Sequence, residues 1–60
     1  MTFRLKITLG DAAMQDGDDI SAALETVADK LRGDDSIALG DRGGIMDANG
    51  NRVGEWKVGR

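Results

Sequence analysis

The chain has 60 residues and a formal net charge of −3. It contains no Cys, which excludes disulfides and thiolate metal sites, and no His, the commonest catalytic base and metal ligand. The acidic balance argues against a protein that neutralises phosphates, and no apolar run is long enough to span a membrane. We therefore expect one small cytoplasmic domain over residues 1–60, in which homodimer formation is one route to additional stability.

Residues 2–9, TFRLKITL, alternate strictly between apolar and polar side chains. Phe3, Leu5, Ile7 and Leu9 occupy one face, and Thr2, Arg4, Lys6 and Thr8 occupy the other. A period of two predicts a strand with one buried face and one wet face. The positive charge of the wet face is interpreted as a solvated surface in preference to a binding surface.

Residues 16–33, DGDDISAALETVADKLRG, predict an amphipathic helix with Asp16 as N-cap and Gly33 in the left-handed position after the C-terminus. Its apolar side chains recur at helical spacing. They are Ile20, Ala23, Leu24, Val27, Ala28 and Leu31. Met14 precedes the cap, where it either closes over this stripe or contacts a partner, and we expect the first.

Residues 33–44, GDDSIALGDRGG, are rich in glycine and aspartate, which is typical of a loop. The short apolar patch from Ser36 to Leu39 is compatible with a strand extension, a turn packed on the core or an exposed lobe. In a mobile loop, Ile37 and Leu39 would be available to a partner.

Residues 44–58, GIMDANGNRVGEWKV, predict a β-hairpin around Asn49-Gly50. A two-residue turn would pair Met46 with Val53 and Ile45 with Gly54, would make Asp47 and Arg52 a cross-strand ion pair, and would leave space at Gly54 for the helix. In a three-residue turn with a glycine bulge, Asp47 would instead oppose Asn51, and Ile45 would face away from Trp56. We prefer the first register, because it gathers the larger apolar groups on one face.

The order strand, helix, strand, strand predicts an α+β fold in which one helix covers a three-stranded antiparallel sheet. A right-handed crossover would place the last strand in the middle. Trp56 is then the largest core side chain, although on the exposed face it would be a binding anchor.

No motif in the chain predicts catalysis, a cofactor or a metal. Asp47-Ala48-Asn49-Gly50-Asn51 resembles the start of a calcium loop, but its glycine is misplaced and the bidentate acid at the twelfth position is absent, so a hairpin turn is preferred. The glycines of residues 40–44 lack the lysine of a phosphate loop and precede a strand. Ser21 and Ser36 have no His to activate them, so we expect no enzyme.

The segments FRLKITLG, DDISAALETVADKL and DANGNRVGEWKV together resemble small, mostly uncharacterised proteins of actinobacteria, their phages and mobile elements. The resemblance covers most of the chain and implies a fold without functional residues. It also implies a lineage in which short genes encode accessory proteins that bind host machinery.

The leading hypothesis is a non-catalytic interaction protein, such as a phage or mobile-element inhibitor of a host CRISPR or restriction complex. Its acidic surface would occupy a basic groove of a host protein or ribonucleoprotein. The residues assigned to that surface are Asp18, Glu25, Asp29, Asp34 and Asp35.

Two alternatives remain open. One is a structural or regulatory homodimer joined through a sheet edge or through the face that carries Met46 and Val53. The other is direct nucleic-acid binding through basic side chains of the open sheet face, which we rank below the interaction protein and the homodimer. Those side chains are Arg4, Lys6, Arg52 and Lys57.

Overall fold

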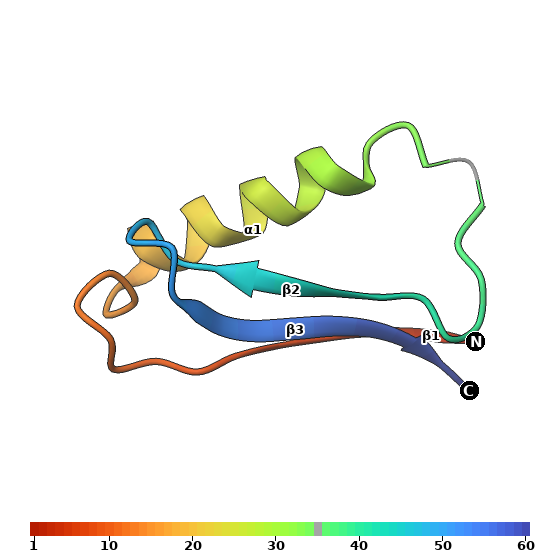
Figure 1. The fold of residues 1–60 in the computed structure, drawn as a ribbon, viewed down its shortest axis with the longest axis horizontal. Coiled ribbons are helices and arrows are strands. Elements are labelled where there is room, and N and C mark those ends of the chain that lie inside the picture. The colour runs from red at the N-terminus through yellow and green to blue at the C-terminus, as the bar shows by residue number, and fades with distance from the viewer. Residues whose placement is uncertain (35) are drawn as a thin grey trace.

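The computed structural model describes residues 1–34 and 36–60, which form one helix on a three-stranded antiparallel sheet (Figure 1). The elements are β1 (Thr2–Ile7), α1 (Gly17–Leu31), β2 (Arg42–Met46) and β3 (Arg52–Gly59). The strand order is β1-β3-β2, so the last strand lies in the middle, as predicted. The predicted α+β fold is confirmed.

The helix begins and ends at the residues that its sequence signals indicate. The side chain of Asp16 accepts a hydrogen bond from the backbone N–H of Asp19 at 2.9 Å, and the Asp19 side chain accepts one from the N–H of Gln15. Beyond the C-terminal end, Gly33 has a φ of +88°, a conformation that L side chains rarely adopt. The helix has 15 residues. Within residues 1–34 and 36–60 no helix is long and apolar enough to cross a membrane.

The β2–β3 hairpin combines both registers considered for it. Next to the turn, Asp47 donates its N–H to the carbonyl of Asn51, and Gly50 has a φ of +83°, as in a three-residue turn. Farther along, Ile45 pairs with Gly54, as in the preferred register. A β-bulge at Val53 connects the two, because one extra residue on β3 restores the alternation. The predicted pairing of Met46 with Val53 is therefore wrong, and Met46 pairs with Arg52.

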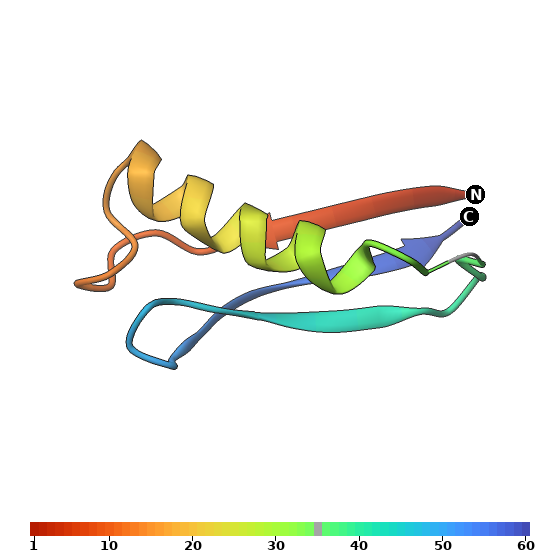
Figure 2. The ribbon, with the colours of Figure 1, turned by 90° about the horizontal axis from the view of Figure 1, so that it is seen from above.

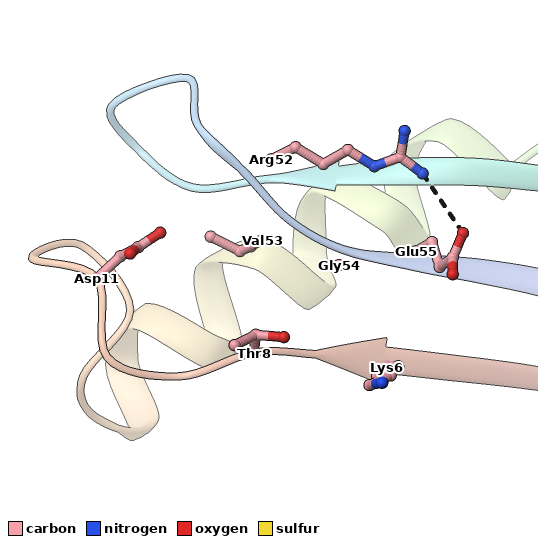
Figure 3. Close-up of a pocket in the computed structure, with 7 residues that line it drawn as sticks. All are labelled: Lys6, Thr8, Asp11, Arg52, Val53, Gly54 and Glu55. Atoms are coloured by element: carbon pink, nitrogen blue, oxygen red, sulfur yellow. Dashed lines mark hydrogen bonds and ion pairs between the residues drawn. The ribbon is translucent and has the colours of Figure 1, made fainter.

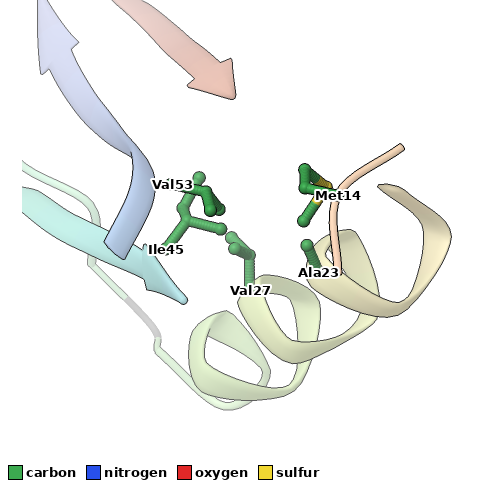
Figure 4. Packing of buried hydrophobic residues seen from close by; sticks show 5 residues of the cluster. All are labelled: Met14, Ala23, Val27, Ile45 and Val53. Atoms are coloured by element: carbon green, nitrogen blue, oxygen red, sulfur yellow. The ribbon is translucent and has the colours of Figure 1, made fainter. Parts of the chain in front are cut away.

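The core lies between α1 and the β2–β3 side of the sheet. Val27 of the helix points toward Ile45 and Val53, and Met14 lies beside Ala23 (Figure 4). Met14 and Ile45 are the largest fully buried side chains, so Met14 closes over the apolar stripe as predicted. The bulge turns Val53 inward, so Met46 and Val53 do not share the exposed face that the homodimer alternative assumed.

The helix covers only part of the sheet, because it packs against β2. Leu24, although it belongs to the predicted apolar stripe, remains 41% exposed. Trp56 is half-buried and stacks on Phe3 of β1, with 5.3 Å between the ring centroids. Trp56 is thus a partly covered core side chain, on the side of the sheet that faces the helix.

Two glycines of the sheet make room for neighbours that the sequence does not reveal. A Cβ at Gly54 would collide with the backbone of Lys6 and Ile7 on β1. The prediction that Gly54 leaves space for the helix is therefore wrong, since the close neighbour is a strand. A Cβ at Gly43 would lie 2.5 Å from the indole Nε1 of Trp56, so this glycine lets the indole ring lie over β2.

Candidate interaction surfaces

Three of the five acidic residues predicted as a binding surface lie on the helix, and we call them the acidic stripe (Asp18, Glu25 and Asp29). Asp18 is in the first turn, where a negative charge complements the helix dipole. Asp29 forms an ion pair with Arg32 near the other end. Glu25, between them, is exposed and forms no ion pair with the described residues. Among the described residues, neither Glu25 nor Asp18 has a side-chain partner, and only Asp18 lies in the first turn of the helix.

The remaining two predicted acids lie beyond the helix. Asp34 is exposed, and its side chain accepts a hydrogen bond from the N–H of Ser36. Asp35 lies outside the described residues. In the same connection Ile37 is half-buried and Leu39 is 51% exposed. Residues 36–39 therefore form neither a strand extension nor a helix, and their apolar side chains are only partly covered.

The open face of the sheet, opposite the helix, is basic. Arg4 pairs with Lys57, and Lys57 pairs with Arg42, so three cations stand side by side across the three strands. Residues directly opposite each other in a sheet share a face, and like charges there destabilise the pair by roughly 0.2–1 kcal/mol. We call this set the cation row (Arg4, Lys57 and Arg42).

Next to the cation row, Lys6 pairs with Glu55, and Glu55 pairs with Gly44. Glu55 also accepts a hydrogen bond from the Arg52 guanidinium at 3.4 Å. The predicted ion pair between Asp47 and Arg52 is wrong, because the bulge brings Arg52 to the face of Glu55. Together, the cation row, Lys6, Arg52 and Glu55 form what we call the basic face, with five of the eight Lys and Arg residues and one of the eleven acids.

An open cleft lies at the end of the basic face nearest the hairpin (Figure 3). Its lining residues are Lys6, Thr8, Asp11, Arg52, Val53, Gly54 and Glu55. Sequence reasoning assigned four cations to this face but missed Arg42. The predicted hairpin begins at Gly44, whereas β2 begins at Arg42. A strand predicted from residue 42 would have placed Arg42 on the same face as Gly44.

The side of the sheet that faces the helix carries uncovered apolar side chains along β1. Phe3 is 43% exposed and Leu5 is 37% exposed. They belong to the predicted buried face of the strand, but α1 packs against β2 and does not cover them. Phe3, Leu5 and the neighbouring Trp56 form what we call the apolar strip.

The calcium-like segment is a hairpin turn that Asp47 holds closed. Its Oδ1 atom accepts hydrogen bonds from the N–H groups of Asn49 and Asn51, at 2.9 and 2.8 Å. Asp47 is also the one charged side chain that is buried among the described residues. Residues 1–34 and 36–60 contain no group of three acidic side chains placed to hold a metal ion. The segment therefore organises the turn.

We expect Asp47→Ala to lower the free energy of unfolding by about 1–3 kcal/mol, because two backbone N–H groups lose their acceptor. Asp47→Asn keeps an acceptor oxygen and should lose less. Urea unfolding followed by circular dichroism measures both changes, with Asp11→Ala as the control, since Asp11 is exposed and its carboxylate accepts no hydrogen bond from the described residues. Equal losses in the Asp47 and Asp11 variants would contradict this role.

No protein-family model, no curated protein and no solved structure matches this chain. The resemblance to actinobacterial and phage proteins thus remains a prediction.

Proposed function

We propose that this protein is a non-catalytic module that binds an acidic protein partner through its basic face. The observation that carries the proposal is the cation row: Arg4, Lys57 and Arg42 are adjacent across the sheet, and no acidic side chain lies between them. The basic face contains only one of the eleven acids, Glu55, so a chain of net charge −3 presents a positive surface there. A surface of one sign recognises a partner of the other.

The cation row forms no ion pair with the described residues. Neighbouring like charges reduce the stability of the sheet, and a lysine or arginine alternating with an acid would keep the strands equally soluble. A small domain has only a few kcal/mol of stability, so three adjacent cations are a measurable cost. An acidic partner would remove that repulsion when it binds.

The acidic stripe supports a second candidate function, an inhibitor that occupies the basic groove of a host defence complex. Glu25 favours it, because this exposed acid has no partner among the described residues. Asp18 and Asp29 contribute to the helix itself, so the stripe supports this function less than the cation row supports the first.

The experiment compares immobilised variants as baits in an extract of the native host. We expect Arg4→Gln/Arg42→Gln to reduce capture of the partner about tenfold, as loss of two interfacial charges implies. The matched variant Lys30→Gln/Arg32→Gln removes the same charge from the helix end and should capture the partner as the unchanged chain does. High salt should reduce capture by all active baits.

Three results would contradict the proposal. Loss of capture by Asp18→Lys/Glu25→Lys alone would favour the inhibitor. Loss of capture after nuclease treatment would favour nucleic-acid binding through the basic face. Equal capture by all baits would exclude both charged surfaces. The two aromatic side chains lie on the helix side of the sheet, so the basic face offers no ring on which a base could stack.

A further inference from the structure

The outer edge of β1 has unpaired backbone groups. Thr8 donates its N–H to Val53 of β3. In an antiparallel ladder the backbone N–H and C=O groups of alternate residues point to the same side. The backbone groups of Arg4 and Lys6 therefore bond to β3, and those of Phe3 and Leu5 point away from the sheet. Within residues 1–34 and 36–60 no hydrogen bond reaches the outward groups. Figure 2 shows β1 at the side of the sheet, with no segment beyond it.

The two faces beside this edge differ in chemistry. Arg4 and Lys6 lie on the basic face. Phe3 and Leu5, in the apolar strip, lie on the helix side and are 43% and 37% exposed. A strand added to the edge would place its alternate side chains next to these two pairs. Acidic side chains would meet the cations, and apolar side chains would extend the apolar strip.

We propose that the free edge of β1 binds an extended segment of a partner protein in which acidic and apolar residues alternate. The inference rests on the proposed function and specifies which part of the acidic partner is recognised. Backbone hydrogen bonds to β1 supply affinity, and the two kinds of side chain fix register and orientation. Trp56, stacked on Phe3, lies close enough to report the event.

A second copy of this chain fits the edge poorly in the registers that pair most of β1. If two β1 strands paired antiparallel with Leu5 opposite Leu5, Arg4 would oppose Lys6 of the other copy. If one β1 strand is shifted by two residues relative to the other, Arg4 opposes Arg4 or Lys6 opposes Lys6. If it is shifted by one residue, the apolar side chains of the two copies lie on opposite faces of the sheet. Each of these three registers with coinciding apolar faces thus creates a like-charge pair, and registers centred on Phe3 or Ile7 pair fewer residues of β1.

The outer edge of β2 is a poorer acceptor. Val58 of β3 donates its N–H to the carbonyl of Asp41, so the backbone groups of Asp41 point toward β3. Because the direction alternates along the strand, the backbone groups of Arg42 and Gly44 point away from the sheet. On the helix side this edge offers Gly43, which lies beneath Trp56, and Ile45, which is buried under the helix. An added strand would find little exposed apolar surface there.

The first test uses synthetic peptides in which glutamate and valine alternate over the length of β1, six residues. We expect saturable binding with a blue shift of Trp56 fluorescence, and about tenfold weaker binding when lysine replaces glutamate. Equal binding of the two peptides, or no binding of either, overturns the proposal. Because the basic-face baits of the capture experiment keep the β1 edge, a failure here leaves their result, and the proposed function, intact.

The second test locates the site at the edge. Leu5→Pro removes an outward N–H while the bonds to β3 remain, and should weaken peptide binding at least about tenfold. Gly44→Pro makes the same change on β2 and should leave binding unchanged; a Cβ at Gly44 would meet the Arg52 side chain at an ordinary 3.5 Å. Circular dichroism verifies that each variant is folded.

Should Leu5→Pro fail to fold, N-methylated peptides give the same information with the unchanged protein. Methylation of one alternating set of amides should abolish binding, and methylation of the other set should not, since an added strand pairs through one side only. Equal effects of both sets overturn the proposal. So does a dimer of the protein alone in sedimentation that Leu5→Pro dissociates, because a second copy would then occupy the edge.

Discussion

Gly54→Ala is expected to remove most of the stability of this protein. The added Cβ would overlap the carbonyl oxygen of Lys6 and lie 2.9 Å from the Cα of Ile7. Both atoms belong to the backbone of β1, so the overlap is relieved only if β1 separates from β3. Overpacking of this kind costs about 3 kcal/mol or more, which is most of what a domain of this size has.

Urea unfolding followed by circular dichroism measures the loss at Gly54. The matched control is Gly44→Ala on the neighbouring strand, where the new Cβ would make only an ordinary 3.5 Å contact with Arg52. We expect its unfolding midpoint to be unchanged or slightly higher, because alanine has the better strand propensity. An unfolding midpoint for Gly54→Ala equal to that of the control would show that β1 and β3 are paired in another register.

The second large effect is expected at Ile45. This side chain is 2% exposed and fills the space between Val27 of the helix and Val53 of the bulge (Figure 4). Ile45→Ala leaves a cavity among these core side chains, and such truncations cost about 2–5 kcal/mol. The chain should be largely unfolded at 37 °C.

The control for Ile45 is Met46→Ala, one residue farther along the same strand. Met46 is 46% exposed, and its truncation should change the free energy of unfolding by about 0.5 kcal/mol or less. Thermal unfolding monitored by Trp56 fluorescence compares the two variants. A loss at Met46 as large as that at Ile45 would mean that the helix packs against another part of β2.

The acidic surface can be recognised from the sequence, whereas the basic surface becomes clear only from the strand pairing. The acidic stripe is visible along the helix because acids at positions 18, 25 and 29 fall on one line. The sequence placed Arg4 and Lys57 on the open face of the sheet, but it did not show that they are adjacent to each other and to Arg42, because adjacency depends on the strand register. The strand register brings them together on one face of the sheet. The preference for the basic face therefore comes from pairing.

The turn at Asp47 shows a similar limit. Asn49-Gly50 predicted a hairpin correctly, since both residues tolerate positive φ. Two registers were compatible with that turn, and each satisfied a different constraint: turn geometry or the gathering of apolar side chains. The bulge at Val53 satisfies the turn geometry and also gathers the apolar side chains on one face, and no local sequence pattern predicts it.

The sequence by itself determined the elements and their order: the period of two in β1, the helical spacing and caps of α1, and the Asn-Gly turn are local and need no tertiary partner. The tertiary structure alone decided which apolar side chains stay uncovered, which glycines admit a neighbour and which charges meet. The physical reason is that α1 packs over β2 and leaves the apolar strip of β1 open. That placement depends on packing between segments distant in the chain, and so does the surface offered to a partner.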